Sequence, residues 1–477
     1  MTIIKRNERD HNQPIVADIC IIGGGVVGLS TALSLATKNP NKKIVLLESG
    51  LDKPGHGQSS AEGEIIGEGV QSLASSRIRA LGGTEWVWGG HSRPFDPIDF
   101  EQRDWVENSG WPITYNEFAK YISAATKILD IDDSNWSNIH PSINYLNIDK
   151  TQIFESCHFK LSPQVAADSK ANTGTFAQSR LKELESTRNL NIYLDHTVVS
   201  LQYSPDKKAV VSVVTKGVNS PEKIISASKF ILATGGIENG RLLKYWFGRK
   251  DAPKLPCFKN IGRYFMEHPH RDVAKVMISE SQIPQYKHHF GARMGSAVHM
   301  IRLKITDQAL RQNRLNSQTI IVVKTKNNKF NNTLLKAITI CEQIPSPSNR
   351  VELSEEKDLY GILKPILHWG FDKQDFYSMN FVAKEFPKFT GMNSIGRPQS
   401  IIYPLGTKLP GGHHHMGTTR MGETSSNAVV DKNCKVFDVD NFYVAGGSVF
   451  PTSGGVNPTL NMLALSQRLV DYITKQG

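Results

Sequence analysis

A run of glycines directly after a short apolar segment is the feature that most restricts how this chain can fold. Residues 15–22 are mostly apolar and rich in β-branched side chains, which predicts a buried strand. Gly23, Gly25 and Gly28 follow in the spacing G-x-G-x-x-G, and an apolar pattern of helical period begins among them. Residues 44–48 then predict a second strand. We therefore expect a strand–helix–strand unit of a parallel sheet.

The same unit predicts a dinucleotide site. Its glycines allow a tight turn and a close approach of the backbone to a pyrophosphate, which would lie at the N-terminus of the helix, near Val27. Glu48 ends the second strand, where a carboxylate can accept hydrogen bonds from ribose hydroxyls. A carboxylate there would repel a 2′-phosphate, so NADP is disfavoured. The motif does not separate FAD from NAD, and the alternative is a glycine-rich turn without a ligand.

Composition excludes several classes of protein. Of the 477 residues, 39% are hydrophobic and 21% are charged, as in globular proteins. The 56 basic residues outnumber the 45 acidic ones but are scattered, so no nucleic-acid partner is expected. Five cysteines without disulfide or metal spacing fit a reducing compartment. Three glycines interrupt the uncharged residues 19–36, so no integral membrane segment is expected. Residues 1–16 lack the apolar stretch of a signal peptide, which favours a cytoplasmic protein.

Later segments predict two kinds of structure. Between about residues 270 and 370, short β-type runs alternate with polar turns, which predicts an antiparallel sheet. The rest of the chain favours alternating strands and helices. Strands are expected over 191–201, 229–233 and 442–445, and helices over 237–247, over 459–474 and, after a turn at 110–112, up to about 130.

Several motifs in one order resemble the signature of the glucose–methanol–choline (GMC) flavoprotein oxidoreductases. Near the C-terminus these are Gly412-His413-His414-His415-Met416-Gly417-Thr418, Ala445-Gly446-Gly447-Ser448 and Asn457-Pro458-Thr459. Earlier in the chain they are Leu81-Gly82-Gly83-Thr84, Trp88-Gly89-Gly90, Ser109-Gly110-Trp111-Pro112-Ile113, Ala233-Thr234-Gly235-Gly236, Gly262-Arg263-Tyr264-Phe265-Met266-Glu267-His268-Pro269 and Asn349-Arg350-Val351. Within the family, the pattern is most similar to bacterial sugar and polyol dehydrogenases and to pyranose oxidases.

The resemblance implies an α/β fold (α+β overall), in which a Rossmann-type FAD-binding domain with a parallel sheet is joined to a substrate domain with an antiparallel sheet. We expect residues 1–100, 190–250 and 410–477 to form a discontinuous FAD-binding domain. Residues 101–189 and 251–409 would form the substrate domain. The implied reaction is FAD-dependent oxidation of an alcohol group, on a sugar, glycoside or polyol, to a carbonyl.

The resemblance assigns the catalytic roles to His414 and Asn457. Alcohol oxidation removes a hydroxyl proton and transfers a hydride from the same carbon. A neutral imidazole is suited to taking the proton, and an Asn side chain can orient the hydroxyl without competing for it, while the flavin takes the hydride. Two alternatives remain: residues 413–415 could be a metal-binding tract, and Asn457 could cap the helix that follows it. We expect no metal.

The resemblance also predicts the cofactor contacts. The expected FAD-binding residues are Gly23, Gly25, Val27, Gly28, Glu48, Gly83, Trp88, Gly89, Gly90, Val199, Ala233, Thr234, Gly235, Gly447, Ser448, Asn457, Pro458 and Thr459. Val199, or its neighbour Val198, would contact the adenine. Pyranose oxidases carry a flavin-linking His at the position of Val87, so non-covalent FAD is expected. Aromatic candidates for sugar contacts are Tyr286, His288, His368 and Trp369, each of which could equally be an ordinary sheet residue.

The sequence leaves the electron acceptor unknown, although the resemblance favours a dehydrogenase over an oxidase. A lyase on the same fold, with structural FAD and no net redox change, is the alternative function. Some relatives in this branch are exported with a small subunit that carries the signal, or pass electrons to a cytochrome. A small subunit or a homo-oligomer is therefore compatible with the resemblance, and periplasmic location by co-export is the alternative to the cytoplasm.

Overall fold

The expected strand–helix–strand unit lies at the centre of the first sheet of the computed structural model, which describes residues 3–4, 14–131, 136, 152–164, 174–218, 221–279, 281, 292–294, 297–325 and 332–476. Strand β2 (Ile15–Ile22) pairs in parallel with β3 (Ile44–Leu47) on one side and with β11 (Lys223–Leu232) on the other. Helix α1 (Val26–Lys38) joins β2 to β3. The prediction for this unit is confirmed to within two residues.

The first sheet has the order β1-β8-β3-β2-β11-β10-β9, with β21 also paired to β11. β11 is long enough to have two partners on one side: its first half is antiparallel to β10 and its end is parallel to β21. The prediction of one strand over 191–201 is wrong, because the backbone turns at Asp195, where φ is 61°. The two resulting strands, β8 and β9, lie toward opposite edges of the sheet. The remaining members are β1 (Ile3–Ile4), β8 (Leu190–Tyr193), β9 (Thr197–Tyr203), β10 (Val210–Lys216) and β21 (Phe442–Val444).

Helices pack around this sheet as the apolar periods predict. α6 (Gly236–Phe247) follows β11, and α9 (Thr459–Lys475) packs against α1. The expected helix before residue 130 consists of two short ones, α2 (Tyr115–Ala119) and α3 (Ile122–Ile128), which also contact α9. Three further short helices are α4 (Phe176–Ser179), α5 (Leu181–Ser186) and α7 (Asp307–Asn313).

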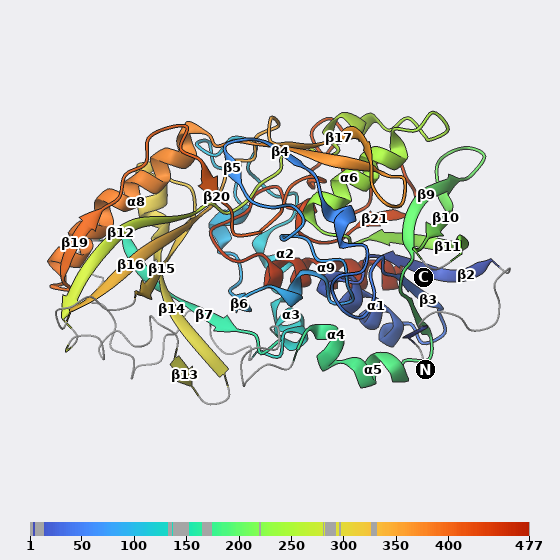
Figure 1. Ribbon diagram of the computed structural model, residues 1–477, viewed down its shortest axis with the longest axis horizontal. Coiled ribbons are helices and arrows are strands. Elements are labelled where there is room, and N and C mark those ends of the chain that lie inside the picture. Colours follow the sequence, from blue (N-terminus) through green and yellow to red (C-terminus); the bar gives the residue numbers. More distant parts are fainter. Residues whose placement is uncertain are drawn as a thin grey trace.

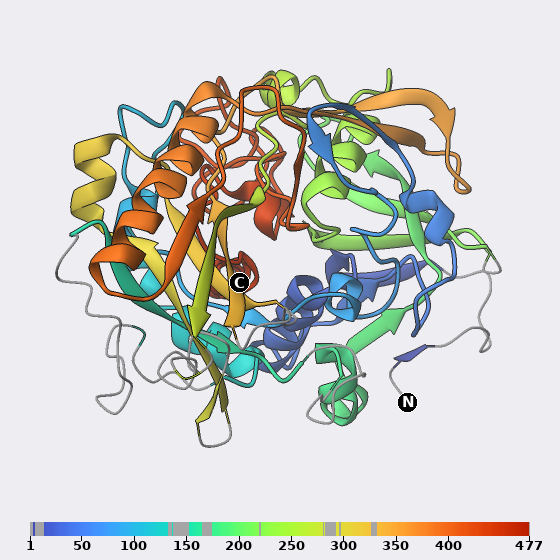
Figure 2. The same cartoon turned by 60° about the vertical axis from the view of Figure 1, so that its left-hand side comes forward.

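The second sheet is antiparallel, as expected, and lies beside the first (Figures 1 and 2). Its order is β19-β12-β16-β15-β14-β7-β6, with β13 paired to β14. Every neighbouring pair in it is antiparallel. Its strands are β6 (His91–Ser92), β7 (Phe154–Leu161), β12 (His270–Ser279), β13 (Ala292–Met294), β14 (Ala297–Ile305), β15 (Gln318–Lys324), β16 (Asn332–Cys341) and β19 (Arg397–Ser400).

Two features of the second half of the chain differ from the prediction. Strand β17 (Arg350–Lys357), expected in the antiparallel sheet, instead forms a separate three-stranded sheet with β18 (Leu363–Trp369) and β4 (Glu64–Gly67). The 20-residue helix α8 (Lys373–Met392), orange in Figure 1, was not predicted. It packs against β12, β16 and β19 although Pro387, which usually ends a helix, lies within it.

Strand pairs that involve residues 64–92 connect the two expected domains. β4 pairs with β18, β5 (Gly69–Val70) pairs with β20 (Leu409–Pro410), and β6 pairs with β7. Strand pairing therefore connects residues on the two sides of the expected boundary at residue 100. Among the residues described, no helix combines the length and the apolar character that crossing a bilayer requires.

Candidate active site

A cavity lies where the carboxyl ends of the parallel strands meet. Its wall includes the residues that follow β2, β3, β11 and β21, which are residues 23–27, 48–49, 233–236 and 445–447. The wall also includes His91 and His270 from the second sheet and residues 412–415 and 457–459 from the C-terminal segment. This edge of a parallel sheet is where open α/β folds bind nucleotides.

The glycines of the first turn are required for different structural reasons. Gly23 has a φ of +111°, and a Cβ there would lie 2.5 Å from the carbonyl oxygen of Ala233, so only glycine lets β2 and β11 approach at this point. A Cβ on Gly28 would lie 1.9 Å from the carbonyl oxygen of Gly23. Gly28 therefore allows α1 to pack against the turn and does not itself line the cavity, whereas Gly23, Gly25 and Val27 do.

Glu48 lines the cavity and also holds its turn together. One carboxylate oxygen, Oε2, accepts a hydrogen bond from the backbone N–H of Gly24, and the other, Oε1, accepts one from that of Gly50, each at 2.7 Å. Burial raises the pKa of the carboxyl, and these two bonds and the nearby Arg79 oppose that rise. The carboxyl oxygens keep lone pairs for a further donor such as a ribose hydroxyl.

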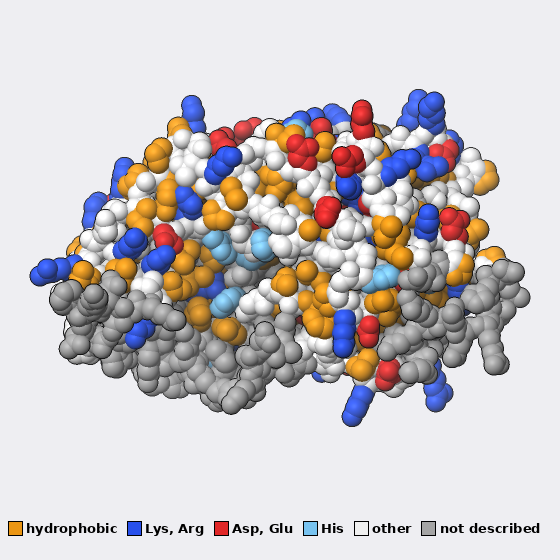
Figure 3. Space-filling view, viewed as in Figure 1, with side chains coloured by type: hydrophobic (Ala, Val, Ile, Leu, Met, Phe, Trp, Pro, Cys, Tyr) orange, Lys and Arg blue, Asp and Glu red, His pale blue; other side chains and the backbone are white. Residues whose placement is uncertain are grey.

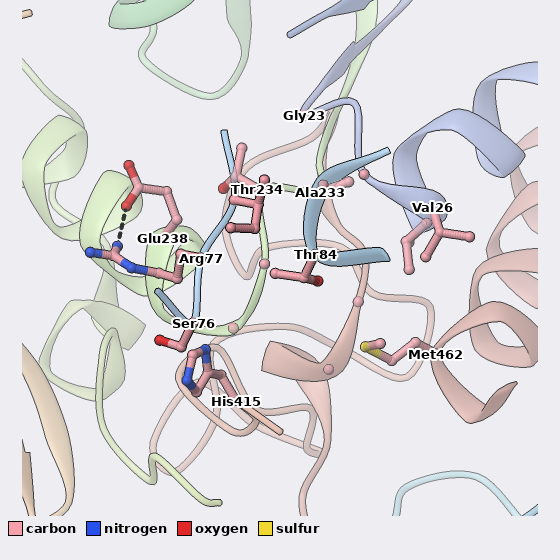
Figure 4. A pocket seen from close by; sticks show the side chains of 18 of the residues that line it. Gly23, Val26, Ser76, Arg77, Thr84, Ala233, Thr234, Glu238, His415 and Met462 are labelled. Carbon is pink, nitrogen blue, oxygen red and sulfur yellow. Dashed lines mark hydrogen bonds and ion pairs between the residues drawn. The ribbon is translucent and has the colours of Figure 1, made fainter. Parts of the chain in front are cut away.

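Three helix N-termini converge on the cavity. Among the described residues, no side chain caps α1, α6 or α9, and their first turns contribute to the cavity wall. Uncapped backbone N–H groups carry partial positive charge and bind anions. The one acidic residue in these first turns, Glu238, is paired with Arg77 at 2.8 Å (Figure 4) and with Arg241 at 2.7 Å. The cavity thus fits a dinucleotide with an anionic pyrophosphate, as the sequence predicts for FAD.

The predicted catalytic pair meets at the other end of the cavity. Nδ2 of Asn457 lies 3.1 Å from Nε2 of His414. His414 is held in place by its own backbone N–H, which donates to Oε1 of Glu267 at 2.6 Å. Its side chain contacts His268, Nδ1 to Nδ1, at 2.9 Å. Burial, with His268, His270, His415 and Arg302 nearby, keeps the pKa of His414 well below the usual range, so the ring is neutral at pH 7.

Glu267 binds the backbone of the loop that contains His414. Its side chain is fully buried, and Oε1 also accepts from the backbone N–H of His268 at 2.9 Å. Burial raises its pKa to about 8, against the lowering effect of these backbone bonds, so the carboxyl is protonated at neutral pH. The motif at residues 262–269 contains Glu267 and His268 but predicts no role for either residue.

Further histidines surround the catalytic pair, and Figure 3 shows His side chains gathered around a hollow in this face of the molecule. His91, His270 and His415 line the cavity, and burial lowers the pKa of each to about 3. Within the described part of the chain, Nδ1 of His91 and Nε2 of His270 have no hydrogen-bond partner. Both atoms are buried, so what these residues give the cavity wall is a set of neutral, polar rings. No group of three His, Cys, Asp or Glu side chains among the described residues is arranged to hold a metal ion.

Most of the predicted site residues line this one cavity. These are Gly23, Gly25, Val27, Glu48, Gly83, Trp88, Gly89, Gly90, Ala233, Thr234, Gly235, His414, Gly447, Asn457, Pro458 and Thr459. Besides Gly28, two predicted residues do not line it. Val198 takes the place of Val199, because neighbouring strand residues point to opposite faces. Ser448 is buried beside the cavity, where Oγ accepts from Nδ2 of Asn239 at 2.8 Å.

Some wall residues were not predicted, and some predicted substrate contacts lie elsewhere. Arg77, Arg79 and Thr197 line the cavity without a motif that would have assigned them. His368 faces Glu352 on β17, and Trp369 is buried and donates to Gln343, so neither lines the cavity. The other two candidates, Tyr286 and His288, lie outside the described residues.

The nucleotide turn, the uncapped helices and the His–Asn pair in one cavity define the class of flavin-dependent oxidoreductases. Comparison with known families agrees: residues 18–133 match the FAD dependent oxidoreductase model, and residues 345–466 match the GMC oxidoreductase model, which includes both His414 and Asn457. Residues 345–466 thus form a GMC oxidoreductase domain, and the chain is an FAD-dependent oxidoreductase.

Two distant relatives extend over most of the chain, and others match a shorter part of it. It is 23% identical to 2-methyl-1,2-propanediol dehydrogenase of Mycolicibacterium austroafricanum, over 96% of this chain and 95% of that protein. It is 22% identical to the fructose dehydrogenase large subunit of Gluconobacter japonicus, over 84% and 82%. A C-glycoside 3-oxidase of Arthrobacter globiformis is 31% identical over 23% of this chain and 21% of its own length.

Solved structures share the fold. Pyridoxine 4-oxidase of Mesorbium loti superposes with a TM-score of 0.60 at 16% identity, covering 95% of this chain and 98% of that one. Formate oxidase of Aspergillus oryzae superposes with a TM-score of 0.60 at 14% identity, covering 98% and 99%. The expected fold class, an FAD-binding domain with a substrate domain, is confirmed.

Proposed function

We propose that this enzyme oxidises an alcohol group of a sugar, glycoside or polyol to a carbonyl, with His414 as the base that takes the hydroxyl proton. The contact between His414 and Asn457, in the cavity that also contains the nucleotide turn, carries this proposal. Hydride acceptance from the same carbon is the chemistry that bound FAD would supply. Residues 23–27, Glu48 and the first turns of α1, α6 and α9 would hold it.

His414 and Asn457 would have different roles toward the substrate hydroxyl group. His414 is neutral at pH 7, so Nε2 can take the proton. Nδ2 of Asn457 lies 3.1 Å from that nitrogen, so it can donate a hydrogen bond to a substrate oxygen that lies beside the pair and also contacts Nε2. Such a donor stabilises the negative charge that grows on the oxygen as the proton leaves. The positive N-terminus of α9 lies in the same cavity and would favour negative charge on a group bound there.

The surroundings of the pair support a hydroxyl-rich, uncharged substrate. His91, His270 and His415 contribute neutral, polar rings to the cavity wall beside the pair. Glu267, the carboxyl nearest to His414, is protonated at neutral pH and buried. The names of the relatives, which include a propanediol dehydrogenase, a fructose dehydrogenase and C-glycoside oxidases, also support substrates of this class.

We propose non-covalent FAD, because Val87 stands where a flavin-linking His would be and itself lines the cavity. We propose a dehydrogenase rather than an oxidase, since the relatives that extend over most of the chain are named dehydrogenases. The terms large subunit and flavoprotein in the names of two relatives support a further subunit as a partner. A cytoplasmic location is part of the same proposal.

An anaerobic titration followed by visible spectroscopy tests the function. The purified holoenzyme is mixed with sugars, polyols and simple alcohols in turn, and bleaching of the oxidised flavin band by one of these classes is the expected result. Admission of air then separates an oxidase, which recovers its band at once, from a dehydrogenase, which needs an artificial acceptor. Product formation without any bleaching would contradict the proposal and favour a lyase.

A further inference from the structure

The hydrogen bonds around His414 form a chain with a fixed direction at each end. Nη1 of Arg302 donates to Oδ1 of Asn457 at 3.1 Å, and Nδ2 of Asn457 contacts Nε2 of His414. Nδ1 of His414 contacts Nδ1 of His268 at 2.9 Å. Nε2 of His268 then contacts the carbonyl oxygen of Gly454 at 2.8 Å and that of Ser453 at 3.2 Å. We propose that this chain fixes the proton of neutral His414 on Nδ1 and leaves Nε2 free as the base, with His268 and Arg302 as positioning residues.

The hydrogen bonds of His268 determine which nitrogen of His414 carries the proton. Two carbonyl oxygens face its Nε2, and a carbonyl can only accept, so Nε2 must carry a proton. His268 is completely buried, and burial lowers its pKa to about 4, so the ring is neutral at pH 7 and Nδ1 has a lone pair. The Nδ1 of His414 that faces it must then be the donor.

The same arrangement follows independently from the side of Arg302. A guanidinium can only donate, so the atom of Asn457 that it meets is the amide oxygen, and the amide nitrogen faces His414. That nitrogen can also only donate, so Nε2 of His414 must accept and has no proton. Arg302 is itself fixed, since it is 1% exposed and its guanidinium stacks on the ring of Phe159 at 3.8 Å. Both ends of the chain thus require the same tautomer.

The backbone holds His268 at this position. Residues 266–269 run antiparallel to residues 411–416, with Met266 and Met416 exchanging backbone hydrogen bonds at 3.0 Å. The carbonyl that receives Nε2 belongs to Gly454, whose φ is +56°, and a Cβ there would lie 2.8 Å from the ring of Phe95. The loop before α9 thus presents both the acceptor for His268 and, three residues later, Asn457.

The inference rests on the proposed role of His414 and adds how its base atom is selected. When Nε2 takes the hydroxyl proton, the O–H bond breaks and an Nε2–H bond forms. The ring becomes an imidazolium that keeps its Nδ1 proton and donates a hydrogen bond through it to Nδ1 of His268. With the other tautomer, the atom facing Asn457 would already carry a proton and could not act as a base. In a serine protease triad, a wrong tautomer costs about 10⁴-fold in rate.

Nuclear magnetic resonance of the oxidised holoenzyme, labelled with ¹⁵N in histidine, tests the tautomer directly. The signals of His414 are assigned by their loss in His414→Gln. We expect a protonated Nδ1 and an unprotonated, pyridine-like Nε2 in the wild-type enzyme. The opposite pattern, with the proton on Nε2, would overturn the inference, and this measurement depends on neither turnover nor a variant of His268.

Two variants of His268 test the link to rate. The amide oxygen of His268→Asn would occupy the position of Nδ1 and could still accept from His414. The amide of His268→Gln would reach only the position of Nε2, so it keeps the bond to Gly454 and loses the acceptor. In single-turnover flavin reduction, we expect the Gln variant to be at least about tenfold slower than the Asn variant, because the proton of His414 is no longer held on Nδ1.

Equal rates in the two variants, with His414 unchanged in its ¹⁵N spectrum, would overturn the positioning role. The proposed function fails in a different way: a His414→Gln enzyme that reduces its flavin at the wild-type rate would refute the base, whatever the tautomer in the wild-type spectrum.

Discussion

Nε2 of His414 lies 3.1 Å from Nδ2 of Asn457, although 43 residues separate the two in the chain. His414 lies in a loop held by Glu267, and Asn457 precedes helix α9, which packs against α1 of the nucleotide unit. The catalytic pair is therefore fixed relative to the cofactor turn by the core of the first sheet. The variants below separate the chemical contribution of the pair from that of this supporting structure.

Replacing His414 by Ala removes the proposed base. We expect anaerobic flavin reduction to slow by at least about 100-fold, because general-base help is worth roughly 10²–10⁴-fold. The oxidised spectrum and the flavin content should remain, since the nucleotide turn is untouched. His368→Ala, on β18 away from the cavity, is the matched control and should reduce its flavin at the wild-type rate. A loss of less than about fivefold in His414→Ala would contradict the assignment.

Asn457→Asp places a carboxylate beside Nε2 of His414. A neighbouring negative charge favours the protonated imidazole, so the pKa of His414 should rise from its lowered value. Because only the neutral ring is a base, the acid limb of the rate of flavin reduction should move to higher pH, by roughly one unit or more after partial compensation by Arg302. Stopped-flow reduction between pH 5 and pH 9 measures this shift, and an unchanged acid limb would show that Asn457 does not contact the working base.

Local patterns account for the parts of the fold that could be predicted. The strand and the helix around Gly23 were predicted correctly because their apolar periods lie within one short segment. The single strand over 191–201 was wrong because no Gly or Pro marks the turn at Asp195. Helix α8 was missed because Pro387 lies within it. Its buried face is nevertheless periodic, with Phe376, Met379, Val382, Ala383, Phe386 and Phe389.

The site residues likewise divide into those that local motifs predict and those whose roles depend on distant contacts. His414 and Asn457 could be predicted because each lies in a motif whose order resembles the family. Glu267, His268 and Arg302 could not, because their roles arise from contacts with residues 146 to 155 positions away. Such contacts depend on how the two sheets meet. The residue types alone, a carboxyl, an imidazole and a guanidinium, would equally suit an exposed surface.

Non-covalent FAD should be released when the enzyme is denatured. Val87 has no atom that can bond to the flavin, so precipitation with acid should leave a colourless pellet and a yellow supernatant. Absorbance of the two fractions measures the distribution. A yellow pellet would contradict the prediction. It would make His91, which lines the same cavity, the candidate for a covalent bond to the flavin. The variant His91→Ala would then be expected to release its flavin.

Glu267→Gln should change how the free energy of unfolding depends on pH. The pKa of Glu267 is about 8 in the folded chain, above its ordinary value of 4.5. Between these values the unfolded chain releases the proton and the folded chain keeps it, so the wild-type protein loses stability as pH rises. Gln cannot ionise and still offers an oxygen to the N–H groups of His268 and His414. The melting temperature of the variant, relative to wild type, should therefore rise from pH 5 to pH 8, and a constant difference would contradict a protonated Glu267.

Gly28→Ala tests the packing of α1 on the nucleotide turn. The new Cβ would lie 1.9 Å from the carbonyl oxygen of Gly23, so the helix or the turn must move. Overpacking of this kind costs about 1–3 kcal/mol of unfolding free energy, and the displaced turn should bind less FAD. Gly391→Ala is the control, because a Cβ there meets nothing within 4 Å and Ala favours helix α8 by up to about 1 kcal/mol. Urea unfolding and the flavin-to-protein absorbance ratio measure both effects. Equal stability and equal flavin content in the two variants would show that the close approach at Gly28 is not required for the site.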